Sequence, residues 1–297
     1  MTTIRKATSV TTYLGAIFDL FEKWAPTEQK RKETDLWYRG VNNLARCKLV
    51  PGSVWRHGYD ENGAAAEFET RASGILHREP ADPWEWYFLM QHYAMGTRLL
   101  DWSESPLVGL YFSLKGAADE KTACVWIMDP RSLNEATMGS YELIAPGGAF
   151  TSNWLPEQIE SSPKAGKKFH SGGKRYSNRY PLAILPRRKE PRILAQWGAF
   201  TVHGTDPSSI DQVMRRKSAD TRMARIEFRG ADLDKMRRDL DALGIRDSTL
   251  FPEPEPLARD IVARFTRETS SKQEFEMAKK GGGRKTIKRK KSPKKKK

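Results

Sequence analysis

Two short stretches of the sequence carry residue types that could do chemistry: Tyr38-Arg39-Gly40, and the run QHYAMGTRLLDWSESPL, which is Gln91–Leu107. Arg39 lies in Thr34–Val41, an aromatic stretch typical of a short strand. A guanidinium binds a phosphate or a carboxylate through two parallel hydrogen bonds, and a following glycine leaves room for a ligand. Arg39 is therefore a candidate anion-binding residue, and the alternative is an ion pair with a surface carboxylate.

Ser103 and Ser105 come just before a predicted helix. Ser105-Pro106 is typical of a helix start, and apolar residues follow at the spacing of one buried helical face. The unpaired N–H groups of that helix start, together with the two hydroxyls, could hold an anion. The alternative is that the serines only cap the helix.

Three further polar residues of the second stretch could have chemical or structural roles. His92 is a candidate base, although a single histidine is more often a hydrogen-bonded core residue. Asp101 is expected to form an ion pair with nearby Arg98 that fixes the loop. The leucines and the tryptophan of the stretch are expected to pack in the core.

Several classes of protein lack support in the sequence. There is no glycine-rich dinucleotide or P-loop motif, no GxSxG motif, and no His or Cys spacing for a metal, so no metal is expected. No apolar run is long enough for a transmembrane helix, and Met1–Val10 lacks the features of a signal peptide. Cys47 and Cys124 are the only cysteines, which favours a reducing, cytoplasmic location and buried thiols.

The net charge of +15 is concentrated at the C-terminal end. Residues 279–297 contain twelve Lys/Arg and no acid, which leaves 40 basic against 37 acidic residues elsewhere. We expect 269–297 to be a disordered tail that attracts RNA or DNA phosphates. The candidate contacts in it are Lys288, Arg289, Lys290, Lys291, Lys294 and Lys295.

A second basic excess lies in 164–192, where ten Lys/Arg accompany one acid. Phe169, Tyr176 and Tyr180 interleave with these charges, as in proteins that stack single-stranded bases. The alternative for both basic segments is a solubilising tail and a solvated loop.

The order of predicted elements favours an α+β fold, because strands lie in the middle and towards the end of the chain while helices lie at the start and the end. We expect an N-terminal helix within 1–30, a domain over 31–268, and an irregular insertion at 134–180. The predicted helices are Ser9–Trp24, Asn62–Leu76, Pro83–Tyr93, the one that starts at Ser105-Pro106, Asp232–Leu243 and Pro256–Arg267. The predicted strands are Thr34–Val41, Ala123–Met128, Leu182–Leu185, Ala199–His203 and Met223–Arg229.

Five motifs stand out along the chain: Trp37–Gly40, Gln91–Trp102, Ser105–Phe112, Gln196–Thr201 and Gly244–Pro252. In these motifs the chain resembles the FRG-domain family, and the resemblance spans Leu36 to Val262. The sequence departs from the family pattern at Ala94, Gly96 and Gly109, where the family usually has Gly, Pro and Ala.

The motif order of that family is similar to that of ADP-ribosyltransferases of the Arg–Ser–Glu type. This resemblance implies a mixed or antiparallel split sheet around a cleft, with flanking helices, and NAD as the substrate. Arg39 would match the first motif of those enzymes and Ser103-Glu104-Ser105 the second. Together with the candidate base His92, the candidate catalytic residues are Arg39, Ser103, Gln196 and His92. The candidate NAD-binding residues are Tyr38, Arg39, Gly40, Gln91, Arg98 and Ser105.

The sequence departs from those transferases at the third motif, because no Glu-x-Glu precedes Gly198. Gln196 lies two residues before Gly198 and cannot carry a negative charge. Either Glu190 or Glu227 supplies the carboxylate, or the site binds a nucleotide without efficient transfer.

Two functional hypotheses follow. One is an NAD-using ADP-ribosyltransferase or glycohydrolase, a toxin or phage-defence effector that acts on a nucleic acid or a protein and has a neutralising partner. The other is a non-catalytic nucleic-acid-binding protein that uses its lysine-rich tail. The first requires Arg39, His92, Ser103 and Gln196 to line one pocket.

Overall fold

The computed structural model describes residues 2–266, apart from 46–47, 57, 119–121, 218–220 and 231. The chain divides into two units, Met1–Phe251 and Pro252–Lys297. Cys47 and the predicted tail at 269–297, with Lys288, Arg289, Lys290, Lys291, Lys294 and Lys295, lie outside the described residues.

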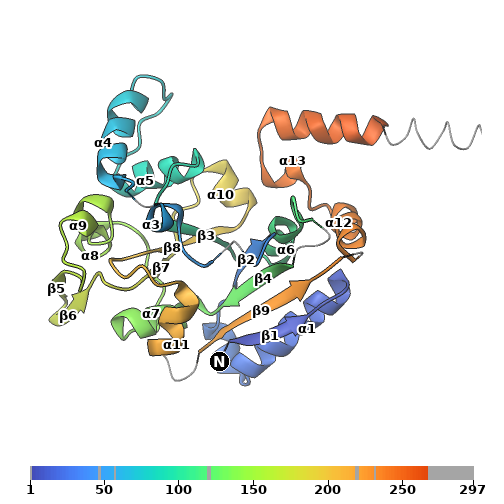
Figure 1. The fold of residues 1–297 in the computed structure, drawn as a ribbon, viewed down its shortest axis with the longest axis horizontal. Helices are drawn as coiled ribbons and strands as arrows, with labels where there is room; N and C mark the ends of the chain where they lie inside the picture. Colours follow the sequence, from blue (N-terminus) through green and yellow to red (C-terminus); the bar gives the residue numbers. More distant parts are fainter. Residues whose placement is uncertain are drawn as a thin grey trace, which may run out of the picture. The chain divides into compact units, whose positions relative to one another are not determined.

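A seven-stranded mixed sheet forms the framework of the first unit (Figure 1). Its strands, in spatial order, are β1 (Thr3–Lys6), β9 (Met223–Phe228), β4 (Ala123–Met128), β2 (Trp37–Val41), β3 (Leu99–Ser103), β8 (Gly198–Val202) and β7 (Leu182–Ile184). All neighbouring strands are antiparallel except β1 and β9. Each residue of β4 is buried, as expected for a continuous apolar run covered on both faces.

Helices cover one face of the sheet in two separate groups. Over β9, β4 and β2 lie α1 (Val10–Trp24), α6 (Pro106–Leu114) and α12 (Asp232–Ala242), which share one apolar cluster with these strands. Over β3, β8 and β7 lie α4 (Glu61–Ala72) and α5 (Pro83–His92), in a second cluster. The boundary between the two helix groups therefore lies between β2 and β3.

The other face of the sheet has a third apolar cluster. It contains the alternate residues of the strands, such as Trp37, Leu100 and Trp126, and residues of α7 (Pro130–Met138) and α11 (Ile210–Lys217). Alternation of side chains along each strand assigns neighbouring residues to opposite clusters.

The described part of 134–180 is more ordered than the sequence indicated. It contains the end of α7, the short helices α8 (Gly148–Ser152) and α9 (Pro156–Glu160), and the hairpin of β5 (Lys168–Ser171) and β6 (Lys174–Ser177), which is a small second sheet. Aromatic contacts order this segment without a regular sequence period, because Phe150 and Trp154 pack against Phe169. The remaining short helices of the first unit are α2 (Glu28–Glu33), α3 (Gly52–Trp55), α10 (Pro191–Ala195) and α13 (Asp247–Leu250).

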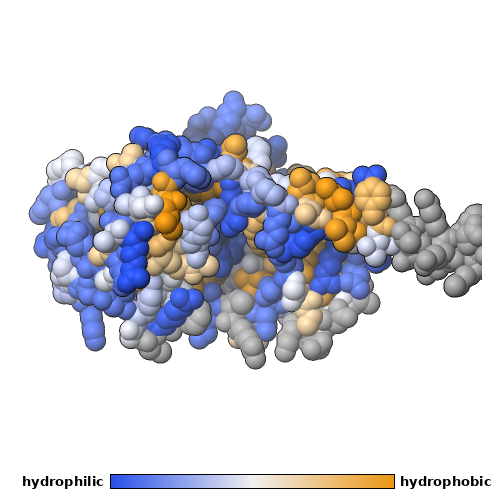
Figure 2. Space-filling view, turned by 90° about the horizontal axis from the view of Figure 1, so that it is seen from above, coloured by the Kyte–Doolittle hydropathy of each residue, from blue (hydrophilic) through white to orange (hydrophobic). Residues whose placement is uncertain are grey.

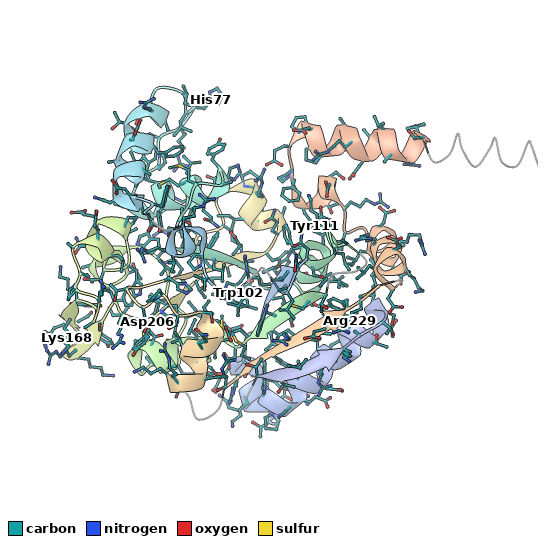
Figure 3. The ribbon with its side chains drawn as sticks, in the orientation of Figure 1. His77, Trp102, Tyr111, Lys168, Asp206 and Arg229 are labelled. Carbon is teal, nitrogen blue, oxygen red and sulfur yellow. The ribbon has the colours of Figure 1, made fainter. Side chains whose placement is uncertain are left out.

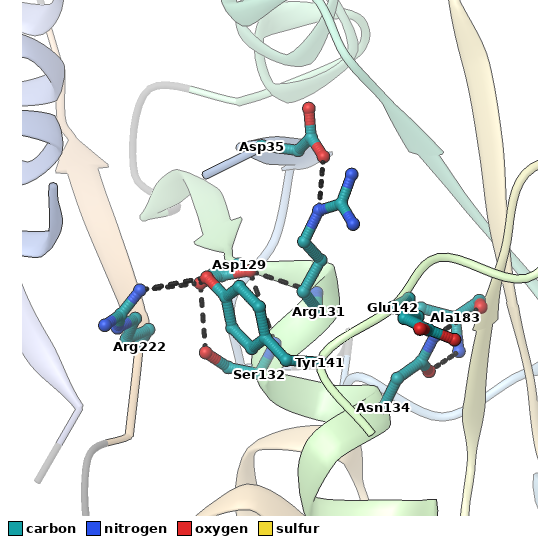
Figure 4. A network of polar contacts seen from close by, with 9 residues as sticks. All are labelled: Asp35, Asp129, Arg131, Ser132, Asn134, Tyr141, Glu142, Ala183 and Arg222. Atoms are coloured by element: carbon teal, nitrogen blue, oxygen red, sulfur yellow. Dashed lines mark hydrogen bonds and ion pairs between the residues drawn. The ribbon is translucent and has the colours of Figure 1, made fainter. Parts of the chain in front are cut away.

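Asp129, at the end of β4, joins several elements through one buried carboxylate (Figure 4). It is fully buried and accepts hydrogen bonds from the N–H groups of Arg131 and Ser132 at the start of α7. It also accepts from the Tyr141 hydroxyl at 2.6 Å and from Arg222 Nη1 at 3.1 Å. Burial, together with this carboxylate, raises the pKa of Tyr141 to about 12.

In the second unit, residues 254–266 form a helix. Its apolar side chains Leu257, Ile261, Val262 and Phe265 are exposed. Figure 2 shows orange, hydrophobic atoms gathered on the surface of this region.

The predicted α+β class is confirmed. All six predicted helices are present, five of them with changed ends, for example α4 at Glu61–Ala72 and the last helix at 254–266. The strand expected over Thr34–Val41 begins at Trp37, and β1 was not predicted from the sequence. Strand β1 has only four residues, too few for a recognisable sequence pattern, and it is defined by its pairing with β9.

Candidate functional site

The sheet is split between β2 and β3. These strands pair at a single position, Tyr38 with Ser103, whereas β2 pairs with β4 over its whole length and β3 does so with β8. Beyond Tyr38 and Ser103, β2 and β3 have no further paired residues, so no continuous ladder of backbone hydrogen bonds joins the two halves of the sheet. Trp102 of β3 lies at this central region (Figure 3).

A pocket of about 370 Å³ lies along this split, within the size range of small-molecule sites. Strands β2, β3 and β8, helices α5, α6 and α10, and the segment after α10 contribute to its wall. The polar residues of the wall are Tyr38, Arg39, Asn42, Gln91, His92, Asp101, Ser103, Glu190, Arg192 and Gln196. Its aromatic residues include Phe88, Phe112, Phe200 and Phe251.

Arg39 spans the split from β2 to β3. Its Nη1 donates to the carbonyl oxygen of Asp101 at 2.7 Å and lies 3.7 Å from the carboxylate oxygen Oδ2 of the same residue. The guanidinium thus bonds the backbone of β3 where ladder bonds from β2 are missing. Three-quarters of the side chain is buried, which restricts its orientation in the pocket wall.

Asp101 is held from its other side by Gln91. The amide nitrogen of Gln91 lies 3.0 Å from each carboxylate oxygen of Asp101, and the Thr97 hydroxyl donates to the amide oxygen of Gln91. The chain Thr97–Gln91–Asp101–Arg39 therefore connects α5 to both edges of the split. The Asp101 side chain remains 58% exposed, so its carboxylate is oriented but still accessible from the pocket.

The sequence predicted a different partner for Asp101. Arg98 pairs with Glu61 of α4 through Nε and Oε2 at 2.9 Å and donates to the carbonyl oxygen of Gly204. Side chains alternate along a strand, so Arg98 and Asp101 point to opposite faces, and the expected pair is wrong. Arg98 is not among the residues that line the pocket. The period-two pattern of β3 was the signal that could have corrected this prediction.

Glu61, the partner of Arg98, belongs to a buried polar cluster away from the pocket. Its carboxylate accepts from the Tyr87 hydroxyl and from the backbone N–H of Arg98 at 2.8 Å. Burial raises the pKa of Glu61, and the charge of Arg98 partly opposes this change. The Arg98 guanidinium therefore has a structural role.

Ser103 lines the pocket, but its hydroxyl is engaged in holding the backbone. It donates to the carbonyl oxygen of Gln196 at 2.7 Å and accepts from the N–H of Ser105 at 3.0 Å. Ser105 caps α6, with its hydroxyl 3.5 Å from the N–H of Val108, and does not line the pocket. Ser105 is therefore a helix cap, which was the alternative to anion binding. Ser103 holds the turn between β3 and α6.

Gln196 and His92 both reach the pocket wall. The amide nitrogen of Gln196 donates to the carbonyl oxygen of Leu250 at 3.0 Å, which ties the segment after α10 to α13. His92 ends α5, and its ring makes an edge contact with Tyr93.

Gly40 gives room for a helix. A Cβ built on Gly40 would lie 2.2 Å from the carbonyl oxygen of Gly109 and 2.3 Å from the N–H nitrogen of Ser113, both in the α6 backbone. A Cβ on Gly109 would in turn lie 2.7 Å from that of Tyr38. The two glycines thus allow α6 to approach β2 closely, and this approach positions Tyr38 and Arg39. Gly40 also borders the pocket, so the expectation that it leaves space for a ligand stays a prediction beside this packing role.

The two candidate glutamates occupy different places. Glu190, exposed at the start of α10, lines the pocket. Glu227 lies on β9, separated from β2 by β4, and pairs with Arg225 at 2.9 Å. Among the residues described, Asp101 and Glu190 are the acids of the pocket wall. Asp101 was not recognised as a pocket acid from the sequence.

The pocket therefore combines an arginine and an oriented carboxylate with aromatic walls. Burial raises the pKa of Tyr38, so its phenol stays protonated at neutral pH. Within the described residues no group of His, Cys, Asp and Glu has the arrangement of a metal site. No helix in that part of the chain is long and apolar enough to cross a membrane.

Residues 34–122 match the family model of the FRG domain. The FRG match begins just before β2 and ends before β4, so it includes Arg39, the Gln91–Asp101 network and α6. It thus covers both sides of the split and the helix that packs across β2. Comparisons with curated proteins and with solved structures gave no match.

Proposed function

We propose that the pocket binds NAD and that the protein is an ADP-ribosyltransferase-like enzyme or an NAD glycohydrolase. The observation that supports this proposal is the convergence of Arg39, His92, Ser103 and Gln196 on one pocket. These residues come from three distant stretches of the sequence, and the split of the sheet brings them together. An effector role, as a toxin or in phage defence with a neutralising partner, is the biological setting that fits such an activity.

Binding would use the two chemical characters of the wall. Arg39 offers a charged, oriented guanidinium to the diphosphate, the contact for which planar N–H donors are best suited. Phe88 and Phe200, which stack with ring centroids 5.0 Å apart, form an apolar wall for a base or the nicotinamide ring.

The reaction breaks the bond between ribose C1′ and the nicotinamide nitrogen. The electron pair of that bond goes to the positively charged pyridinium, which leaves as neutral nicotinamide. An acceptor oxygen or nitrogen on water, a protein or a nucleic acid forms the new bond to C1′ and releases its proton to solvent. Positive charge develops on the ribose in between, so a carboxylate close to it lowers the barrier.

Asp101 is the residue that we assign to this electrostatic role. It lines the pocket with an accessible carboxylate, and hydrogen bonds from Gln91 fix both of its oxygens. Glu190 is the second acid of the wall and is exposed, so it is less restrained. Ser103 and Gln196 act as positioning residues, since they hold the turns on which the pocket is built.

Calorimetric titration of the full chain with NAD tests binding, and Arg39→Lys is the informative variant. Lysine lacks the planar, paired N–H donors of the guanidinium, so this substitution is expected to weaken NAD binding about tenfold or more. Arg5→Lys on β1 is the matched control, because Arg5 is also a strand arginine paired with an aspartate, Asp19, and is remote from the pocket lining. Equal affinity in wild type and Arg39→Lys would contradict this binding mode.

Nicotinamide release from NAD by the full chain, in the presence of cell extract, tests the reaction. Asp101→Asn is expected to lower the release rate by about 100-fold while the affinity for NAD changes much less. NAD binding without any release or labelled product would restrict the protein to a binding module.

A second candidate function is nucleic-acid binding by residues 279–297, supported by their twelve Lys/Arg without an acid. Truncation after Ala278 should then remove a salt-sensitive component of RNA or DNA binding. Unchanged binding in the truncated chain would remove this role from the tail.

A further inference from the structure

The hairpin of β5 and β6 carries a concentrated positive charge away from the pocket. Lys168, His170, Lys174 and Arg175, here called the hairpin patch, are all exposed. No acidic residue occurs anywhere from Ser161 to Lys189 in the sequence. Lys168 points outward at the edge of the view in Figure 3. In the described part of the chain, none of Lys168, Lys174 and Arg175 takes part in an ion pair.

The register of the strands places Lys168, His170 and Arg175 on one face of the hairpin. Lys174, next to the turn, lies on the other face together with Phe169 and Tyr176, and its side chain is exposed. His170 lies directly opposite Arg175, and Lys168 is opposite Ser177 on the same face. Lys168 and Arg175 are diagonal neighbours on this face, and like charges at that spacing repel each other. The nearest acids along the chain, Glu157 and Glu160 of α9, make no ion pair with the hairpin among the described contacts. A bound polyanion would relieve this repulsion.

The opposite face of the hairpin is anchored in the body of the protein. Phe169 and Tyr176 stack at 5.9 Å and both contact Phe150, at 5.5 and 5.0 Å between ring centroids. Asn178 is fully buried and accepts from the N–H of Lys167 at 2.8 Å, while its amide donates to the carbonyl oxygen of Asn153 at 2.7 Å. The hairpin patch is therefore presented by an ordered element.

The packing of Phe169 and Tyr176 against the body bears on whether the hairpin binds single-stranded or duplex nucleic acid. Stacking on single-stranded bases needs accessible rings, but Phe169 and Tyr176 are occupied by contacts with the body. A two-stranded ribbon about 5 Å across between strand axes fits the roughly 12 Å wide major groove of B-form DNA. The major groove of duplex RNA is deep and too narrow for such an element.

We infer that the hairpin patch is a binding site for duplex DNA, with Lys168, Lys174 and Arg175 neutralising backbone phosphates. The turn at Gly172 and Gly173, both with positive φ, gives the hairpin the narrow tip that insertion into a groove requires. This site is formed by residues 168–175 and shares no residue with the basic tail, and it does not depend on NAD binding.

Fluorescence anisotropy of the full chain on a 20-base-pair DNA duplex, measured over a range of salt concentrations, tests this inference. The triple variant Lys168→Gln, Lys174→Gln, Arg175→Gln removes three charges from the hairpin patch. The slope of log K against log salt is expected to become less steep by about 2.7, at about 0.9 for each lost phosphate contact. The tail is present in every sample, so its contribution is constant.

The triple variant Lys23→Gln, Lys30→Gln, Lys32→Gln is the matched control, because it removes the same charge from exposed positions on α1 and α2. It is expected to change the slope by less than about 0.5, since distant surface charges are largely screened. An equal change in the two variants, or none in the hairpin variant, overturns the inference. Hairpin-dependent binding that is tighter to single-stranded DNA or to duplex RNA of the same length also overturns the assignment to duplex DNA.

Discussion

Asp101 and Asp129 have the same chemistry and an arginine neighbour, yet they lie in opposite environments. Asp129 is fully buried and its oxygens accept from two backbone N–H groups, two hydroxyls and Arg222. Asp101 is 58% exposed and is oriented by Gln91 and Arg39 at the edge of a pocket. The difference shows that saturation of a carboxylate by the protein's own donors marks a structural role, whereas orientation with access marks a candidate ligand site.

The largest expected effect separates these two aspartates by stability. Asp129→Asn removes the buried carboxylate that pairs with Arg222 and accepts from the start of α7, so the free energy of unfolding should fall by about 3 kcal/mol. Asp101→Asn should lower it by less than about 1 kcal/mol, because an exposed ion pair contributes little. Denaturant unfolding of both variants measures the difference, and equal losses would remove the distinction between the two sites.

His203 extends the comparison to pH, because it is fully buried whereas the pocket groups are accessible. Burial, with a smaller contribution from Arg98, lowers the pKa of His203 to about 3, and the backbone of Ser208 and the charge of Asp206 oppose this change. The unfolded chain binds the proton below about pH 6.5 but the folded chain does not, so acid favours unfolding.

From pH 7 to pH 4 His203 should therefore remove about 3 kcal/mol from the free energy of unfolding, a loss that begins near pH 6.5. The variant His203→Gln lacks this titration. Between pH 7 and pH 4 its free energy of unfolding should therefore fall by about 3 kcal/mol less than that of the wild type. The NMR resonance of His203 is the histidine signal that is missing from the spectrum of the His203→Gln variant. If that resonance titrates near pH 6.5 in the folded protein, the buried, neutral state is ruled out.

The smallest effect concerns the turn that follows Gln91 and His92. Ala94 has a φ of +58°, a left-handed conformation that favours glycine. Ala94→Gly should raise the free energy of unfolding by about 0.5 kcal/mol, since relief of strain exceeds the added entropy of the unfolded chain. Ala66→Gly within α4 is the control and should lower it by about 1 kcal/mol. A loss of stability in both variants would show that Ala94 is not strained.

The elements with strong local patterns were predictable from the sequence. The apolar run of β4 and the Ser105-Pro106 start of α6 appear as expected. The hairpin at 168–177 was not recognised, because contacts of Phe150 and Trp154 order it across sequence distance. The partners of Arg98 and Asp101 were assigned wrongly because sequence proximity was given more weight than the alternation of side chains along β3.

The sequence by itself determined the residue types of the candidate site, the FRG-like motifs and the segregation of charge toward the C-terminal end. Local chemistry is sufficient for these properties because a motif, a helix cap or a charge run depends on residues close together in the chain. Only the tertiary structure decided that β2 and β3 part after one pair, that Asp101 rather than Glu227 is beside Arg39, and that Gly40 accommodates α6. Each of these depends on the pairing and packing of segments far apart in the sequence, which local propensity does not encode.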